Sequence, residues 1–287
     1  MEKENNKLKG AFVERDLSWM YFNHRILQEA EKKDIPVLER MTFLGIYSNN
    51  LDEFFRVRIA SLNRIAQSKD KTLKNDRERA KRTIKDINHL NSCYNKEFEK
   101  AVQEITEELE QKGIRLLHEN QLNDEQKDFI QRFYLEKLNG STNPIWLSQI
   151  KEIGATADDG IFLAIKRMEW IEGKKKPKID YALIAMPDKE IGRFVRLPKS
   201  DEKENIMFLD DVIRYCLPMI FVGSGNCTYE AYSFKFTKDA EMEMDNDLGS
   251  GVMQKVAKGV KSRKSGEPKR TTYDDHMPQG PRTRIMP

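Results

Sequence analysis

The stretch PVLERMTFLGIYSNNLDEFFRVRIASL, residues 36–62, decides the first half of the fold. Apolar residues recur at helical spacing on both sides of a polar interruption, Ser-Asn-Asn at residues 48–50. Serine and asparagine side chains compete with a helix for backbone hydrogen bonds, so they favour caps over helix interiors. The pattern therefore predicts two helices that join at a cap, with Asn50 as the N-cap of the second helix.

Two interpretations of Asn50 remain open at this point. In the first, its side chain satisfies backbone N–H groups at the helix start and does nothing else. In the second, the amide also uses its remaining hydrogen-bonding groups to contact a ligand. An asparagine amide has two N–H donors and one carbonyl acceptor, which match the edge of a purine base.

Composition sets broad limits. A chain of 287 residues is long enough for one large or two ordinary domains, and its 34% of charged residues indicates a soluble, surface-rich protein. The net charge of +3 identifies no partner by itself. Three cysteines without metal-site spacing fit a reducing cytoplasm. The start, MEKENNKLKG, has no apolar signal core, and the composition leaves a peripheral membrane association open.

Residues 15–112 are predicted to form an antiparallel helical domain after a polar arm at residues 1–14. Ser18 is expected to cap a helix that runs to about Lys32 and has Phe22 on its apolar face. A long helical period, which covers about thirty residues, ends near Gly113, and glycine is the usual residue just after a helix end. The change of period at Gly113 is the predicted domain boundary.

Residues 113–275 read as a mixed domain, so the predicted fold class is α+β. We expect an antiparallel sheet of at least four strands with flanking helices, because apolar residues alternate in several short segments. Helices should begin at the caps Asn123 and Asp210. Residues 276–287 read as a disordered or non-native tail. The expected strands are residues 113–117, 161–171, 178–186, 193–197, 206–209 and 228–237.

Two basic segments are candidates for binding a polyanion. Residues 56–85 contain eleven lysines or arginines and three acids, either as a solvated helix face or as an electropositive wall. Arg56 and Arg58 follow Asn50 within about two helical turns. Lys255 and Lys258 belong to a second basic helix, predicted from its spacing after a glycine-rich turn.

No catalytic constellation is visible in the sequence. The four histidines are scattered, no segment matches GxxxxGK[ST], and no cysteine or histidine cluster has metal-ligand spacing. Adjacent acids such as Asp210 and Asp211 are interpreted as caps. His276 lies in a segment without surrounding arginines, so we assign it no phosphohistidine role. The sequence therefore predicts no catalytic residue and no metal ligand.

Several long segments carry a family resemblance. RDLSWMYFNHRILQEA, VLERMTFLGIYS and SNNLDEFFRVRIASL resemble the amino-terminal helical domain of bacterial polyphosphate kinase of the first type, and FLDDVIRYCLPMIF and YEAYSFKFTKDAEMEMD resemble its head domain. The resemblance covers roughly residues 15–277. It implies that Asn50, the second asparagine of the triplet, touches the ATP base, and that Asn49 does not.

The resemblance also implies an activity for the complete family enzyme, which moves the terminal phosphate of ATP onto a growing polyphosphate chain with Mg²⁺ through a phosphohistidine. In the family, two further domains carry that histidine and the metal ligands, and this sequence ends before them. We therefore expect an amino-terminal portion that contributes ATP-base contact and assembly, and that is inactive alone.

The expected partners follow from the same resemblance. They are ATP, inorganic polyphosphate and further copies of the chain, which would associate through the helical and head domains; nucleic acid is not expected. The expected location is the cytoplasm, with or without peripheral membrane association. The alternative is a non-catalytic module that self-associates or binds polyanions without turnover.

Overall fold

The computed structural model describes residues 13–149, 160–222, 225–238, 268–273 and 277. These residues divide into two compact units after Glu108. We call the described residues up to Glu108 the helical unit and those from Leu109 the sheet unit. The predicted basic helix of residues 252–263, with Lys255 and Lys258, lies outside the described residues, as does all of 276–287 except Met277.

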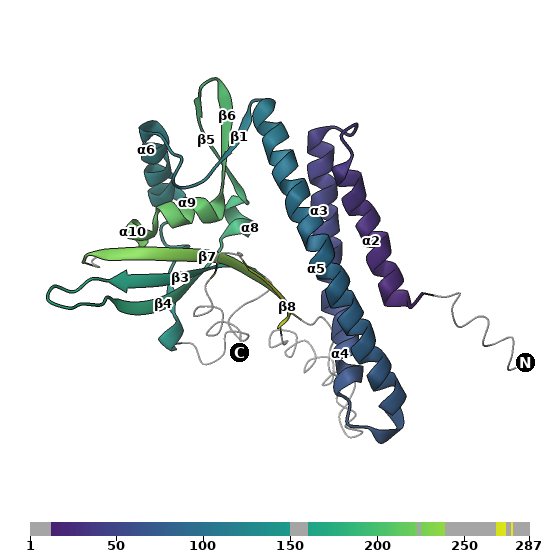
Figure 1. The fold of residues 1–287 in the computed structure, drawn as a ribbon. Helices are drawn as coiled ribbons and strands as arrows, with labels where there is room; N and C mark the ends of the chain where they lie inside the picture. The colour runs from purple at the N-terminus through teal and green to yellow at the C-terminus, as the bar shows by residue number, and fades with distance from the viewer. Residues whose placement is uncertain (1–12, 150–159, 223–224, 239–267, 274–276, 278–287) are drawn as a thin grey trace, which may run out of the picture. The chain divides into compact units, whose positions relative to one another are not determined.

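The helical unit is built from long helices that lie side by side (Figure 1). None of its described residues forms a strand, which confirms the helical prediction. The three long helices bury one face each against the others, as their helical apolar periods require. Its elements are α2 (Arg15–Glu31), α3 (Val37–Phe54), the π-helix η1 (Phe55–Ile59), α4 (Ala60–Gln67), the 3-10 helix η2 (Lys71–Leu73) and α5 (Lys74–Gln111).

A buried arginine joins the helices of this unit. The Arg40 side chain in α3 is 1% exposed and contacts both neighbouring helices. Its Nε donates to the carbonyl oxygen of Ala30 at 2.7 Å, and its Nη1 donates to Glu108 Oε2 in α5 at 2.6 Å. The surrounding core is apolar and includes Met20, Leu27, Leu44, Leu51, Ile87 and Ile105.

The start of α2 differs from the prediction. The helix begins at Arg15, and the side chain of Glu14 accepts hydrogen bonds from the backbone N–H groups of Asp16 and Leu17. Ser18 is therefore inside the first turns and not the cap. Phe22 is 57% exposed, so its place on the buried face was also wrong.

The sheet unit contains short helices and two sheets. The helical elements are α6 (Asp124–Phe133), the π-helix η3 (Tyr134–Leu138), the 3-10 helix η4 (Leu147–Gln149), α8 (Asp188–Ile191), α9 (Leu209–Tyr215) and α10 (Leu217–Ile220). The strands are β1 (Ile114–Leu117), β2 (Ile145–Trp146), β3 (Ile161–Glu169), β4 (Lys178–Ala185), β5 (Phe194–Ser200), β6 (Lys203–Phe208), β7 (Cys227–Lys238) and β8 (Pro268–Tyr273).

The larger sheet has the order β2-β4-β3-β7-β8, and all its described pairings are antiparallel. This confirms the predicted antiparallel sheet. The smaller sheet has the order β1-β6-β5, and β1 pairs with β6 in parallel. The sequence did not predict a second sheet or a parallel pair, because the two strands are separated by most of the unit and no local pattern links them.

The main core of the sheet unit lies between its two sheets and the helices α6, α9 and α10 (Figure 1). It includes Ile130, Leu163, Ile184, Met207 and Ile213. On the other face of the larger sheet, Phe162, Ala164, Leu183 and Phe234 pack with Met277, which is 2% exposed. Met277 therefore belongs to a core and not to the tail in which the sequence placed it.

Three helix boundaries were predicted in this region, of which two are confirmed and one is wrong. Gly113 follows α5 with a positive φ of 85°, which glycine adopts without strain. Asn123 caps α6 in a reciprocal pair of side-chain bonds with Gln126. Asp210 is not a cap, because α9 begins at Leu209 and Phe208 holds the cap position.

Among the described residues, no helix combines the length and the apolar character that a membrane crossing requires.

Candidate functional site

Asn50 lies inside α3 and not at a helix start. The helix continues without interruption from Val37 to Phe54, so the predicted cap at Asn50 was wrong. The local preference of Ser and Asn for caps is overridden because Leu44, Tyr47 and Leu51 bury a continuous apolar stripe on both sides of the triplet. The departure from α-helical geometry comes later, as the π-helical turn η1.

The Asn50 amide joins a polar chain between α2 and α3. Its Nδ2 donates to Asn23 Oδ1 at 3.2 Å, and Asn23 Nδ2 donates to the backbone carbonyl of Tyr47 at 3.2 Å. Asn23 is 1% exposed, whereas Asn50 is half-buried. The bond to Asn23 uses one of the two N–H groups of the Asn50 amide. Asn49, by contrast, is exposed.

Arg56 and Arg58 lie in the π-helical turn that follows α3. Arg58 donates from Nε and Nη2 to the two carboxylate oxygens of Asp16, at 2.9 and 3.3 Å. Burial of Asp16 raises the pKa of its carboxyl, and the neighbouring Glu14 carboxylate acts in the same direction, whereas the charge of Arg15 acts in the opposite one. Arg56 Nε lies 3.8 Å from Glu53 Oε2. The charge of Arg58 is thus compensated within the helical unit.

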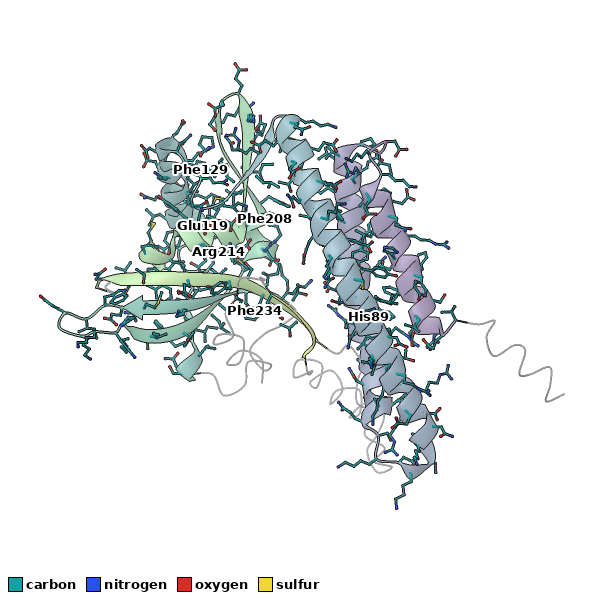
Figure 2. The ribbon with its side chains drawn as sticks, in the orientation of Figure 1. His89, Glu119, Phe129, Phe208, Arg214 and Phe234 are labelled. Carbon is teal, nitrogen blue, oxygen red and sulfur yellow. The ribbon has the colours of Figure 1, made fainter. Side chains whose placement is uncertain are left out.

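The histidines differ in their surroundings. His24 stacks on Tyr94 with ring centroids 3.9 Å apart, and its Nε2 lies 2.6 Å from Glu97 Oε2. It therefore packs between helices. His89 lies on the exposed face of α5 (Figure 2).

His118 belongs to a cluster that the sequence analysis missed. Its Nδ1 lies 3.0 Å from Asp211 Oδ2, and one ligand atom each of His118, Glu119 and Asp211 lies within 4.8 Å of the others. Asp211 also accepts a short hydrogen bond from Arg214 Nη1, and burial raises the pKa of its carboxyl. Glu119 and Arg214 lie on the same side of the sheet unit (Figure 2). Asp211 is therefore more than the helix-start acid that the sequence suggested.

Comparison with known proteins gives two successive family matches. Residues 12–117 match the polyphosphate kinase N-terminal domain, and residues 125–286 match the polyphosphate kinase middle domain. The polyphosphate kinase of Vibrio parahaemolyticus is 32% identical over 275 residues, and that of Escherichia coli K12 is 34% identical over 271 residues. Each alignment covers 93% of this chain and 38% of the relative.

A solved structure agrees with these matches. The crystal structure of polyphosphate kinase from Porphyromonas gingivalis superimposes with a TM-score of 0.74 at 28% identity, covering 96% of this chain and 37% of that chain. The fold and the matches together define a helical amino-terminal domain that is followed by the middle domain of a kinase. The chain belongs to the polyphosphate kinase family. It spans about 38% of the length of the curated relatives that it matches.

Proposed function

We propose that this chain is the part of a polyphosphate kinase that contacts the ATP base and supports assembly. The complete enzyme would transfer the terminal phosphate of ATP to a growing inorganic polyphosphate chain. The observation that carries this proposal is the match to both family domains, in order, along nearly the whole chain. The relatives are much longer than this chain. The transferase activity, the binding of ATP and polyphosphate, and self-association are therefore proposed for the chain as part of a complete enzyme.

Asn50 is the proposed contact to the base. Two features support this role: its position in the family triplet and its half-buried amide, which keeps one N–H group beyond the bond to Asn23. The competing explanation is that Asn50 only ties α3 to α2 through Asn23. The two explanations differ in what a substitution does to ATP dependence and to stability.

The basic wall is the proposed contact to polyphosphate, but its members are not equivalent. Arg58 would have to exchange Asp16 for a phosphate, which makes it a weak candidate. Arg56 is the other candidate, and its Nε lies 3.8 Å from Glu53 Oε2, on a side chain that is 63% exposed. Lys69, Lys71 and Lys74 have exposed side chains and add positive charge to the basic segment of residues 56–85.

Mg²⁺ would act in the complete enzyme. Magnesium prefers oxygen ligands and keeps several of its waters. Among the described residues, the cluster with metal-ligand geometry contains the imidazole of His118, which does not fit that preference. We derive no catalytic step through magnesium, and its ligands are proposed to lie outside this chain.

The test uses this chain joined to the remaining domains of the family. Asn50→Ala should raise the Michaelis constant for ATP by about 5- to 30-fold, since one neutral hydrogen bond contributes on the order of 1–2 kcal/mol in a site. Polyphosphate binding should stay nearly unchanged. Asn49→Ala is the matched control and should leave both constants as they are.

A second control separates binding from helix packing. Asn23→Ala removes the same interhelical bond while the Asn50 amide stays in place. If Asn23→Ala raises the Michaelis constant as much as Asn50→Ala does, the effect comes from helix packing and the base contact is refuted. The melting temperature of each variant should be measured beside the kinetics.

The chain alone should not turn over ATP. Incubation of the 287-residue protein with labelled ATP and magnesium should release no phosphate and leave no phosphorylated histidine. Turnover that is abolished by His276→Ala would overturn this expectation. Tight polyphosphate binding without turnover, lost at high salt, would favour the stand-alone polyanion-binding module instead.

A further inference from the structure

The cluster of His118, Glu119 and Asp211 arises from the parallel strand pair of the smaller sheet. In that pair Leu117 is opposite Met207, so β1 and β6 end together. His118 and Glu119 directly follow β1, and α9 begins just after β6. Parallel strands bring their carboxyl ends to one edge of a sheet, where side chains from distant parts of the sequence meet.

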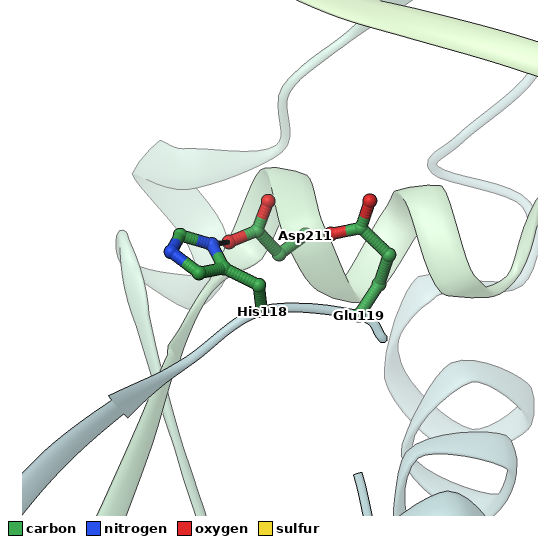
Figure 3. Close-up of side chains that lie close together, drawn as sticks. All are labelled: His118, Glu119 and Asp211. Carbon is green, nitrogen blue, oxygen red and sulfur yellow. Dashed lines mark hydrogen bonds and ion pairs between the residues drawn. The ribbon is translucent and has the colours of Figure 1, made fainter. Parts of the chain in front are cut away.

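The geometry of the cluster is close to that of a metal site. Ligands bound tetrahedrally at about 2.0–2.2 Å from a zinc ion lie roughly 3.3–3.6 Å apart. The 3.0 Å between His118 Nδ1 and Asp211 Oδ2 is near that separation, and the Glu119 carboxylate lies within 4.8 Å of both (Figure 3). Glu119 must therefore move by about 1 Å, which a side chain in a loop can do.

Asp211 is held in place by contacts outside the cluster. The carboxylate of Asp211 is buried, and its second oxygen accepts from Arg214. Arg214 is fixed in turn by bonds to the Ala231 carbonyl at 3.1 Å and to Ser233 Oγ at 2.8 Å. In protein metal sites, hydrogen bonds of this kind orient the side chains that bind the metal.

The backbone of His118 is held by a turn. Its N–H donates to Gln121 Oε1 at 2.8 Å, and its carbonyl accepts from the Gln121 N–H at 3.0 Å. Glu119 makes no hydrogen bond or ion pair with any residue in the part of the chain that the structure describes. The cluster thus combines two positioned ligands with a third that has no competing partner there.

We propose that His118, Glu119 and Asp211 bind a divalent transition metal of the zinc type, with a fourth position open to water. One imidazole and two carboxylates suit Zn²⁺ and not Mg²⁺ or Ca²⁺, which prefer oxygen ligands alone. The charge of Arg214 beside Asp211 opposes the cation, so we expect dissociation constants on the order of micromolar. The metal would join the end of β1 to the start of α9.

Metal binding would change the tautomer of His118. An ionised Asp211 carboxylate can only accept hydrogen bonds, so without metal its Oδ2 favours the tautomer of the neutral His118 imidazole that has the hydrogen on Nδ1. The metal takes that position on Nδ1, and a proton from water then resides on the exposed Nε2 of the neutral imidazole. The exchange needs no net release of a proton, and it gives a spectroscopic signature of its own.

The experiment is a zinc titration of the 287-residue chain by calorimetry. Cys93 is an exposed thiol that can bind zinc, so the reference protein carries Cys93→Ser. We expect one zinc ion per chain in this reference. His118→Ala should weaken binding by at least about 10-fold and Glu119→Gln by about 3- to 10-fold. The exposed His89 supplies the matched control, and His89→Ala should change nothing.

Nitrogen NMR of the histidine side chains gives an independent measurement. Zinc should move the hydrogen of the His118 imidazole from Nδ1 to Nε2 and leave His89 unchanged. The proposal fails if zinc binding disappears with Cys93→Ser, since the thiol alone then held the ion. It also fails if His118→Ala keeps the reference affinity or if the tautomer does not change. Glu119→Gln keeps the test valid even where a His118 variant folds poorly.

Discussion

The two units assemble their polar contacts in different ways. In the helical unit, Asn50 meets Asn23 and Asn23 meets Tyr47 because antiparallel neighbouring helices bring residues 24 to 27 positions apart together. In the sheet unit, His118 meets Asp211 across 93 positions because two parallel strands end at one edge. The first kind of contact follows from a short helical hairpin. The second requires most of the unit to be folded already.

The two units also differ in which side chains stabilise them. The helical unit depends on a few buried polar side chains that connect its helices, above all Arg40. The sheet unit depends on a larger apolar core between its two sheets, with polar networks at its edge. Substitutions in the two units and chemical labelling of their side chains should therefore have different effects.

The largest expected difference is in thiol reactivity. Cys93 is exposed in the helical unit, and Cys216 is buried in the sheet unit. Burial raises the pKa of the Cys216 thiol to about 12, so at pH 8 only about one in ten thousand is thiolate, the reactive form. We expect iodoacetamide to label Cys216 at least roughly 100-fold more slowly than Cys93, as followed by peptide mass spectrometry. In guanidinium chloride both should react at similar rates. Equal rates in the native protein would mean that the core around α9 opens readily.

The second prediction concerns the buried arginine of the helical unit. Arg40→Met should lower the free energy of unfolding by about 3 kcal/mol, the low end for breaking a buried ion pair. The low end applies because the Glu108 side chain is 27% exposed and regains water. Denaturant unfolding measures the loss, and hydrogen exchange should locate it in α2, α3 and α5.

The control for Arg40 is another arginine of the same unit. Arg25 lies on the exposed face of α2, so Arg25→Met should change stability by less than about 0.5 kcal/mol. If the two variants unfold alike, Arg40 is not the polar link that joins these helices.

The third prediction tests a cap in the sheet unit. Asn123 accepts from the Gln126 N–H, and Gln126 returns a bond to the Asn123 N–H. Asn123→Ala should cost about 1 kcal/mol of unfolding free energy, as for other N-caps, whereas Asn123→Asp should retain most of it. Thermal unfolding of the two variants gives the measurement. Equal losses would show that α6 gains its stability from packing alone.

The capping box of Asn123 also shows which features the sequence predicts well. Its two residues are three positions apart, so the pattern and the contact are both local. The strands were predicted for the same reason, because alternation within one strand reflects its own two faces. The strands β2 and β8 were missed, since β2 has only two residues and the segment of β8 has no clear alternation.

The missed features depend on distant contacts. The triplet at residues 48–50 favours a cap by local preference, yet α3 continues through it because packing on both sides outweighs that preference. The cluster of His118 and Asp211 has no local signal at all, because it exists only where β1 pairs with β6. Residue types at fixed spacing therefore predicted the elements, while the parallel register decided the cluster.

The smallest expected effect concerns the start of α2, where the sequence placed the cap four residues too late. Glu14 receives bonds from the N–H groups of Asp16 and Leu17 at 2.7 and 3.2 Å, so Glu14→Ala leaves both unpaired by the side chain. We expect a loss of about 0.5–1 kcal/mol, in the lower range for caps because water can reach the helix start. Ser18 is exposed and its N–H already bonds to the Glu14 carbonyl at 2.8 Å, so Ser18→Ala should be neutral within about 0.3 kcal/mol. Urea unfolding of both variants decides between the two caps. A larger loss for Ser18→Ala than for Glu14→Ala would mean that Ser18 is the cap, as the sequence predicted.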